Sequence, residues 1–259
     1  MYAFYFKCCF FLINSIDEGT RVKLKEIEGM IGSDFISANW ISGETNGTEH
    51  SYIATQGPLQ HTVEDFWRMV WEQNVNVVVM LSNLLENGRE KVWQYWPEGD
   101  SIMHLNQFQI QLQNSTTDEQ LIRRFIVLTE KETQKKKNVT HIQYISWPDH
   151  GLPEHEHGFA QILDLVENEN INQAPIVVHC SAGIGRTGTF CIAHSNWLKL
   201  KLLLWSSTTD KFDLKKSVLR MREQRAGMIQ TKDQYLYCYI SLQEKVTKYK
   251  TMLAYKNQR

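Results

Sequence analysis

The segment Ile176–Thr189, IVVHCSAGIGRTGT, places a cysteine and an arginine on either side of a run of small residues. The β-branched residues before Cys180 predict a buried strand, and the apolar spacing after Arg186 predicts a helix. Cys180 should therefore lie at a helix N-terminus, where free N–H groups and the helix dipole favour an anion and the thiolate. Arg186 carries a planar fork that suits two oxygens of one phosphoryl group. The spacing predicts a nucleophile and a clamp that face one phosphate.

Three other interpretations of this turn are open to test on the sequence. Gly183, Gly185 and Gly188 spell the dinucleotide-binding pattern, but that unit needs a second strand ending in an acidic residue. Thr189–Trp205 is instead rich in leucine and lysine and predicts a helix, with no strand before Asp210. A nucleotide P-loop requires a lysine after the glycines, which is absent here. A buried structural cysteine is the third alternative, and the arginine at this spacing argues against it.

The string HCSAGIGRTG resembles the signature of the cysteine-dependent protein tyrosine phosphatases. The resemblance implies that Cys180 is the nucleophile, that Thr187 eases departure of the thiolate, and that His179 supports the loop. It also implies that the phosphoryl group is bound by Ser181, Ala182, Gly183, Ile184, Gly185 and Arg186.

Further segments resemble other parts of the same family. Trp147–Pro153, WPDHGLP, resembles its mobile acid loop, with Asp149 as the general acid that protonates the leaving phenol. In AGMIQTKDQY, Gln230 would orient the hydrolytic water and Gln234 would lie nearby. In ENGREKVWQYWP, Glu86 would brace the signature arginine. Lys91, from the same segment, would contact the acid loop.

The N-terminal stretch Met1–Ile13 is apolar and ambiguous. Lys7 interrupts the run and no cleavage site follows, so an edge strand competes with a signal peptide. Aligned with the family pattern, Phe10 stands at the tyrosine that walls the phosphotyrosine pocket. Leu12 stands at an aspartate that accepts N–H groups of the bound peptide, which leucine cannot do. We expect one phosphatase domain, residues 1–259, shortened at its N-terminus.

Composition limits the partners. The chain has 259 residues, is 42% hydrophobic and has a net charge of -1, which gives no electrostatic case for nucleic acid. No apolar run reaches the roughly 18 residues of a membrane span. The five cysteines have no metal spacing and fit reduced thiols in the cytoplasm. The histidines and glutamates at 150–157 could suggest a metal, but a charged helix start explains them, and neither metal nor cofactor is expected.

Hydrophobic patterning and the resemblance together imply an α/β fold, a twisted mixed sheet flanked by helices on both faces. Thr62 is expected to cap the first helix, and Lys135–Lys137 is expected at an exposed hairpin tip. Strands are expected at Asp34–Ile41, Val75–Leu81, Phe108–Leu112, Ile122–Thr129, Val139–Ile145 and Ile176–Val178, and Tyr52–Leu59, YIATQGPL, resembles a further motif of the family. Helices are expected after Thr62, around Phe159–Val166, at Thr189–Trp205, at Asp213–Arg225, and along a final core stripe from Tyr235 to Tyr249.

The resulting interpretation is a monomeric tyrosine-specific phosphatase that acts on phosphotyrosine-containing proteins through a phosphocysteine. The alternative is a phosphotyrosine-binding module with weak turnover, because Leu12 leaves a peptide poorly anchored. The compact chain is also similar to the phosphatases of polydnaviruses, which would place it in a host cytoplasm.

Overall fold

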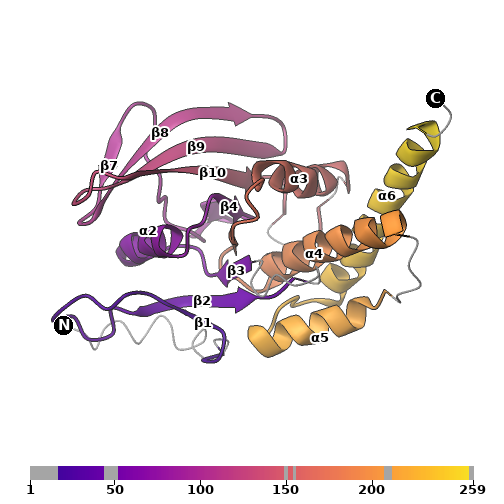
Figure 1. Ribbon diagram of the computed structural model, residues 1–259, viewed down its shortest axis with the longest axis horizontal. Coiled ribbons are helices and arrows are strands. Elements are labelled where there is room, and N and C mark those ends of the chain that lie inside the picture. Colours follow the sequence, from indigo (N-terminus) through magenta and orange to yellow (C-terminus); the bar gives the residue numbers. More distant parts are fainter. Residues whose placement is uncertain (1–16, 44–51, 149–150, 154–155, 207–211, 257–259) are drawn as a thin grey trace.

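A nine-stranded mixed sheet runs through the computed structural model, which describes residues 17–43, 52–148, 151–153, 156–206 and 212–256 (Figure 1). The strand order is β1-β2-β3-β11-β4-β10-β9-β8-β7. The strands are β1 (Arg21–Lys23), β2 (Phe35–Ile41), β3 (Tyr52–Thr55), β4 (Val77–Met80), β7 (Ile102–His104), β8 (Phe108–Thr117), β9 (Leu121–Glu130), β10 (Lys136–Tyr144) and β11 (Ile176–His179). The four central strands β3, β11, β4 and β10 are parallel, and the flanking strands pair antiparallel.

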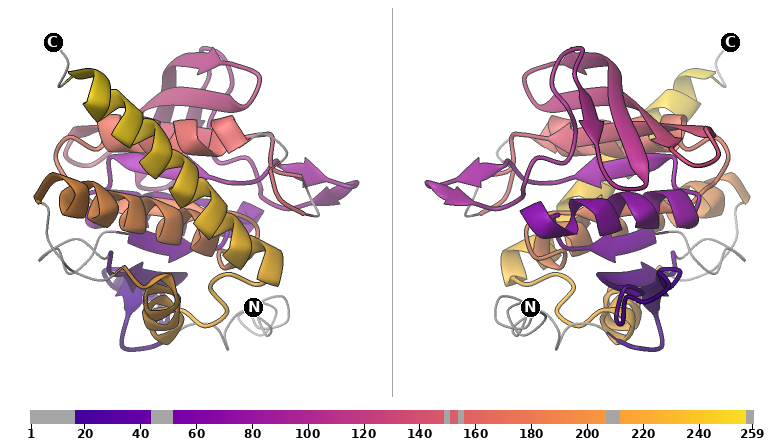
Figure 2. Two further views of the ribbon diagram at one scale, coloured as in Figure 1. Left: turned by 90° about the vertical axis from the view of Figure 1, so that its right-hand side faces the viewer. Right: turned by 90° about the vertical axis from the view of Figure 1, so that its left-hand side faces the viewer.

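Helices cover both faces of this sheet, as expected from the sequence (Figure 2). The helices are α2 (Val63–Glu72), α3 (Glu156–Glu169), α4 (Gly185–Ser206), α5 (Leu214–Gln224) and α6 (Lys232–Lys256), with a short turn η2 (Gln60–Thr62) before α2. Helix α2 packs on one face, and α3, α4, α5 and α6 contribute to the core on the other.

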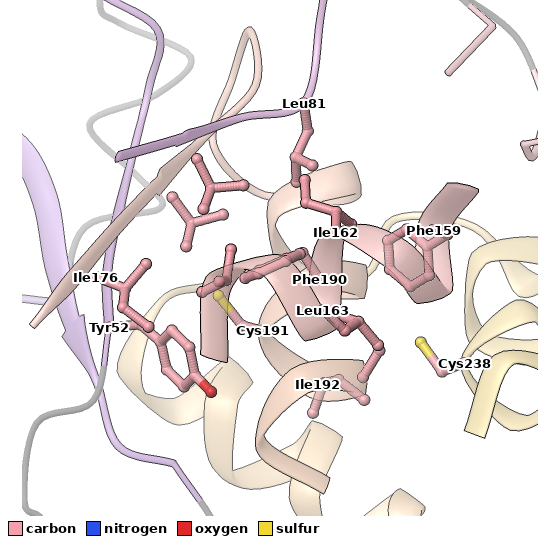
Figure 3. Packing of buried hydrophobic residues seen from close by; sticks show 14 of the residues in the cluster. Tyr52, Leu81, Phe159, Ile162, Leu163, Ile176, Phe190, Cys191, Ile192 and Cys238 are labelled. Atoms are coloured by element: carbon pink, nitrogen blue, oxygen red, sulfur yellow. The ribbon is translucent and has the colours of Figure 1, made fainter. Parts of the chain in front are cut away.

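The central strands are fully buried because both of their faces carry apolar side chains. In β11, Ile176 and Val178 enter the core with α3, α4, α5 and α6, whereas Val177 enters the core with α2. Each strand thus alternates between two apolar layers, which explains its continuous run of β-branched residues. Figure 3 shows the larger layer, where Cys191 and Cys238 lie among apolar side chains.

Several local expectations are wrong in whole or in part. Thr62 is the N-cap residue of α2, as expected, but its side chain makes no capping hydrogen bond and its hydroxyl instead accepts from the N–H of Leu59 at 2.9 Å. Lys137 lies inside β10 rather than at a hairpin tip, and its ammonium donates to the carbonyl of Trp71 at the end of α2, at 3.1 Å. Tyr239 is 40% exposed and does not belong to the core stripe of α6.

The sheet is also longer than the apolar pattern indicates. Strand β8 continues past a bulge at Leu112/Asn114 into polar residues that lie beyond the expected strand Phe108–Leu112. The short edge strands β1 and β7 were not predicted. The segment after Leu84 forms a two-stranded hairpin of β5 (Leu85–Glu86) and β6 (Arg89–Glu90) that projects from the body (Figure 2).

Candidate active site

The Cys180–Arg186 loop joins the end of β11 to the start of α4, as the sequence predicts. Gly183 has φ 70°, and a Cβ built on it would lie 2.1 Å from the carbonyl oxygen of Thr55. Only glycine fits this position, because both the backbone conformation and the close approach to β3 exclude a side chain. Cys180 is 6% exposed, and Ser181 next to it is exposed. The loop therefore opens to the surface over a nearly buried sulfur.

The carbonyl oxygens of this loop are engaged on its inner side. The Cys180 carbonyl accepts from Nδ1 of His179 at 3.1 Å, and the Ser181 carbonyl accepts from the N–H of Gly57 at 2.9 Å. The Ile184 carbonyl accepts from the N–H of Ile229 at 3.1 Å. In a trans peptide the N–H points opposite to the carbonyl. The N–H groups that follow these carbonyls are thus turned away from the protein interior. In that orientation they can bind an anion.

Arg225 holds the two remaining carbonyls of the turn. Its Nε donates to the carbonyl of Gly183 at 2.9 Å and its Nη2 to that of Ala182 at 3.3 Å. Its Nη1 donates to Oδ1 of Asn39 at 2.7 Å, which ties the loop to β2. Burial lowers the pKa of Arg225 to about 10, and the neighbouring Cys180 acts in the opposite direction. A buried cation therefore stabilises the loop and places positive charge beside the cysteine.

The sulfur of Cys180 has a hydroxyl neighbour. Oγ1 of Thr187 lies 3.3 Å from Sγ and donates toward it, and Thr187 is fully buried. Thr187 is held in the first turn of α4. The structure therefore places the Thr187 hydroxyl beside the Cys180 sulfur, and the role of Thr187 in catalysis stays a prediction.

The guanidinium of Arg186 is fixed by three elements. Glu86 in the β5–β6 hairpin binds it with both oxygens, Oε1 to Nη1 at 2.6 Å and Oε2 to Nη2 at 3.0 Å. The carbonyl of Leu81, after β4, accepts from Nη1 at 3.1 Å. The carbonyl of Pro148, in the expected acid loop, accepts from Nη2 at 3.0 Å. The side chains of Arg186 and Glu86 are 12% and 5% exposed, so the pair is shielded from solvent and strongly oriented.

The expected acid loop reaches the site through its first residues. The ring of Trp147 lies under Arg186, with Cζ 5.9 Å from the ring centroid, and its Nε1 donates to the carbonyl of Gly151 at 3.4 Å. Asp149 itself lies outside the described residues. Trp147 and Pro148, which precede Asp149, therefore lie next to Arg186, and the role of Asp149 stays a prediction.

Two glutamines approach the loop from the segment before α6. A Cβ built on Gly185 would lie 2.5 Å from Oε1 of Gln230 and 3.1 Å from Nε2 of Gln234. The side-chain Oε1 of Gln234 accepts from the backbone N–H of Gln230 at 2.9 Å, so the Gln234 side chain holds the backbone at Gln230. Both side chains lie against the Cys180–Arg186 turn, and their roles in catalysis stay predictions.

Other expected residues are placed less directly. His179 lies behind the loop, where it bonds the Cys180 carbonyl. Lys91 follows the β5–β6 hairpin, and its N–H donates to the carbonyl of Leu84 at 2.8 Å. Phe10 and Leu12 lie outside the described residues, as do His150, Glu154 and His155. Within the described ranges, no group of three or more histidine, cysteine, aspartate or glutamate side chains could hold a metal ion.

The sequence did not single out Arg225 or Asn39. It did not single out the buried Tyr95 either, whose hydroxyl lies 2.7 Å from Nε2 of His179. Arg225 ends a predicted helix and Asn39 lies in a predicted strand, so neither pattern distinguishes them from structural residues. Their signal is burial of a polar group next to the loop, which only the tertiary structure shows. Both Arg225 and Asn39 are 0% exposed.

Comparison with known proteins decides the family. The model of the protein-tyrosine phosphatase family matches residues 14–244. The chain belongs to the protein-tyrosine phosphatase family. The fold expectation is confirmed too, since the crystal structure of the catalytic domain of human protein tyrosine phosphatase non-receptor type 18 superposes with a TM-score of 0.79. That match has 35% identity and covers 87% of this chain and 79% of the other.

Two relatives are similar to this chain over only part of their own length. Tyrosine-protein phosphatase 2 of Dictyostelium discoideum is 43% identical over 219 residues, which are 84% of this chain and 56% of that protein. Mouse tyrosine-protein phosphatase non-receptor type 9 is 39% identical over 87% of this chain and 39% of its own length. The phosphatase chain described here thus spans about half of the first relative. Among its described helices, none is long and apolar enough to cross a membrane.

Proposed function

We propose that this chain hydrolyses phosphotyrosine in proteins through a phosphocysteine intermediate. The observation that carries the proposal is the contact set at one turn: the Cys180 sulfur beside Thr187, and Arg186 held by Glu86 next to the acid loop. A nucleophile, an anion clamp and backbone N–H groups turned away from the protein interior converge there, which is the arrangement that phosphoryl transfer needs. Neither a metal nor a cofactor is part of the proposal.

The first step is an in-line attack of the Cys180 thiolate on phosphorus. The S–P bond forms as the P–O bond to the phenol breaks, and Asp149 gives its proton to the leaving oxygen. Arg186 and the N–H groups of residues 181–186 hold the three remaining oxygens. A phenol of pKa about 10 leaves poorly as an anion, so the proton from Asp149 lowers the barrier.

The second step returns the enzyme to its starting state. Gln230 positions a water, with Gln234 nearby, Asp149 takes the proton of that water, and the oxygen attacks phosphorus as the P–S bond breaks. Thr187 stabilises the departing thiolate through its hydroxyl at 3.3 Å. The product is inorganic phosphate. Lys91 would help to hold the acid loop, and Phe10 would form one wall of the phosphotyrosine pocket.

Selectivity for tyrosine is part of the proposal. Cys180 is 6% exposed and lies at the base of the turn, so a phosphorylated residue must be long enough to reach it. The extended ring of phosphotyrosine meets that condition, and phosphoserine does not. Hydrolysis of a phosphotyrosine peptide with no hydrolysis of the matching phosphoserine peptide is the expected result.

The cellular setting is proposed on the thiols. Cys180, Cys191 and Cys238 are free and buried, which fits a reducing compartment such as the cytoplasm. The chain would act there as a single-domain monomer. Kinship with polydnavirus phosphatases, and hence a host cytoplasm, is a further hypothesis that no single residue carries. Comparison with viral sequences is its test.

The deciding experiment is hydrolysis of p-nitrophenyl phosphate in the presence of EDTA, by the wild type, Cys180→Ser and Asp149→Ala. We expect no turnover by Cys180→Ser and a strong reduction in Asp149→Ala. A folded, reduced wild type without turnover would overturn the proposal. Binding of a phosphotyrosine peptide by that inactive protein would then identify it as a binding module.

A further inference from the structure

A chain of buried polar side chains connects β9 to the cysteine loop. Nη1 of Arg124 lies 3.2 Å from Nδ1 of His141, whose Nε2 lies 2.7 Å from the hydroxyl of Tyr95. The same hydroxyl lies 2.7 Å from Nε2 of His179, and Nδ1 of His179 lies 3.1 Å from the carbonyl oxygen of Cys180. Tyr95, His141 and His179 are each 0% exposed. Four consecutive hydrogen bonds thus end on the backbone of the nucleophile.

The two ends of this chain fix the direction of every hydrogen bond in it. A carbonyl oxygen can only accept, so His179 carries its proton on Nδ1 and accepts on Nε2 from the Tyr95 hydroxyl. A guanidinium can only donate, so His141 accepts on Nδ1 and donates from Nε2 to the Tyr95 oxygen. All four bonds therefore point from Arg124 toward Cys180.

The rings of His141, His179 and Tyr95 in this series of hydrogen bonds are neutral at physiological pH. Burial lowers the pKa of His179 to about 4, and burial together with Arg124 and His179 lowers the pKa of His141 well below 6.5. Burial also raises the pKa of Tyr95 well above 10. With one proton per imidazole, the direction of each bond depends on which nitrogen carries it. The Cys180 carbonyl makes that choice for His179, and Arg124 makes it for His141.

We propose that Arg124 is a positioning residue for the cysteine loop, because it fixes the tautomer of His141 and thereby directs the Tyr95 hydroxyl to His179. This inference rests on the proposed phosphatase function. The hydrogen of every bond points toward the loop, so the bond dipoles align with their positive ends facing Cys180. Aligned bonds strengthen one another and stabilise negative charge at the end that they face.

Removal of the arginine releases this constraint. Without a donor at Nδ1, His141 is free to carry its proton there and to accept from Tyr95 on Nε2. The single hydroxyl proton of Tyr95 is then divided between two acceptors, His141 and His179. His179 loses its fixed donor, the Cys180 peptide is held less firmly, and the thiolate is stabilised less.

The neighbouring residue Arg123 provides a matched control. Arg124 stacks on Trp96, with Cζ 4.3 Å from the ring centroid, and Arg123 stacks on Phe125 at 4.4 Å. Both residues lie on β9 with intermediate exposure. Arg123 pairs with Glu169 at the end of α3 and makes none of the four hydrogen bonds that link Arg124 to Cys180. Replacing either arginine with methionine removes one stacked cation from the same strand.

The first test measures reactivity in Arg124→Met, Arg124→Lys and Arg123→Met. We expect Arg124→Met to lower kcat/KM about fivefold to tenfold, the loss expected from about one net hydrogen bond. The pH midpoint for alkylation of Cys180 by iodoacetamide should rise in the same variant, while Arg186 and Arg225 stay in place. Arg124→Lys keeps a donor-only cation and should recover part of both effects. Arg123→Met should match the wild type in both.

The second test does not depend on activity. Nitrogen-15 spectra of histidine-labelled wild type should show His179 protonated on Nδ1 and His141 on Nε2, and Arg124→Met should change the His141 pattern. His141 protonated on Nδ1 in the wild type would overturn the inference, even in an inactive protein. An active wild type whose alkylation midpoint is unchanged in Arg124→Met would overturn it as well. A wild type without turnover but with the expected tautomers would count against the phosphatase proposal alone.

Discussion

Glu86 and Arg186 face each other in a two-pronged ion pair, with N···O distances of 2.6 and 3.0 Å, although 100 residues separate them in the sequence. The carboxylate has a second partner, since Oε1 also accepts from the N–H of Asn83 at 3.1 Å. The hairpin that carries Glu86 thus orients the clamp in a fixed plane. A clamp that is held before substrate arrives loses little entropy when it binds the phosphoryl oxygens.

Replacement of Glu86 should therefore damage catalysis more than its distance from phosphorus suggests. We expect Glu86→Gln to lower kcat on p-nitrophenyl phosphate about 100-fold, because a misplaced guanidinium no longer matches the transition state. The matched control is Glu90→Gln, an exposed carboxylate on the same hairpin. Equal activity of Glu86→Gln and Glu90→Gln would show that the ion pair does not position Arg186.

Thr187 should act mainly in the second half of the reaction. Its hydroxyl donates to the Cys180 sulfur at 3.3 Å, and that bond strengthens as the sulfur regains negative charge on leaving phosphorus. We expect Thr187→Val to slow breakdown of the phosphoenzyme about tenfold.

Rapid mixing with p-nitrophenyl phosphate measures that effect of Thr187→Val. The variant should show a burst of p-nitrophenol close to one equivalent, followed by slow turnover. Thr187→Ser keeps the hydroxyl and should behave like the wild type. A variant in which the burst itself is slowed by the same factor would place the residue in the first step instead.

Arg225 should be needed for the shape of the loop as well as for stability. Its removal leaves Oδ1 of Asn39 and the carbonyls of Ala182 and Gly183 without their donor in a buried region. We expect Arg225→Met to lower the free energy of unfolding by about 3 kcal/mol, as for other buried groups left unpaired. Urea unfolding measures the loss, and the exposed Arg220 on α5, the helix that ends just before Arg225, supplies the control Arg220→Met.

The affinity of Arg225→Met for inorganic phosphate distinguishes a loop-specific role from a general loss of stability. Without urea, at a temperature where the variant stays folded, phosphate should bind more weakly because the loop N–H groups are no longer oriented. Unchanged affinity for inorganic phosphate in the folded variant would contradict this role, whatever the stability.

The parts of the site that could be predicted are those carried by contiguous residues. The strand, turn and helix around Cys180 follow from apolar periodicity and glycine spacing, and both are local properties. Glu86 was expected only through the resemblance, since a charged hairpin gives no sign of its partner. Arg225 and Asn39 meet through tertiary structure across 186 residues, and a buried arginine has the same letter as an exposed one. The polar end of β8 was not predicted as a strand either, because pairing with β9 rather than burial of apolar side chains holds it in place.

Three buried histidines should make the fold sensitive to mild acid. Burial lowers the pKa of His194 to about 3 and of His179 to about 4, and it lowers the pKa of His141 well below its usual value. In the unfolded chain each would titrate near about 6.5. Above that pH both states are neutral and the stability is complete. Below it the unfolded state binds up to three more protons, so the free energy of unfolding falls as the pH decreases from about 6.5 toward 4.

The size of this effect can be isolated at His194, which lies outside the proposed catalytic site. Its Nδ1 bonds the hydroxyl of Tyr52 at 2.7 Å, and its ring stacks on Phe190. Each buried histidine contributes a slope of about 1.4 kcal/mol per pH unit between pH 6 and 5. His194→Gln should therefore reduce the total slope by one proton, and the exposed His104→Gln should leave it unchanged. Urea titrations at several pH values measure both, and an identical slope in His194→Gln would show that His194 is not held neutral by its buried site.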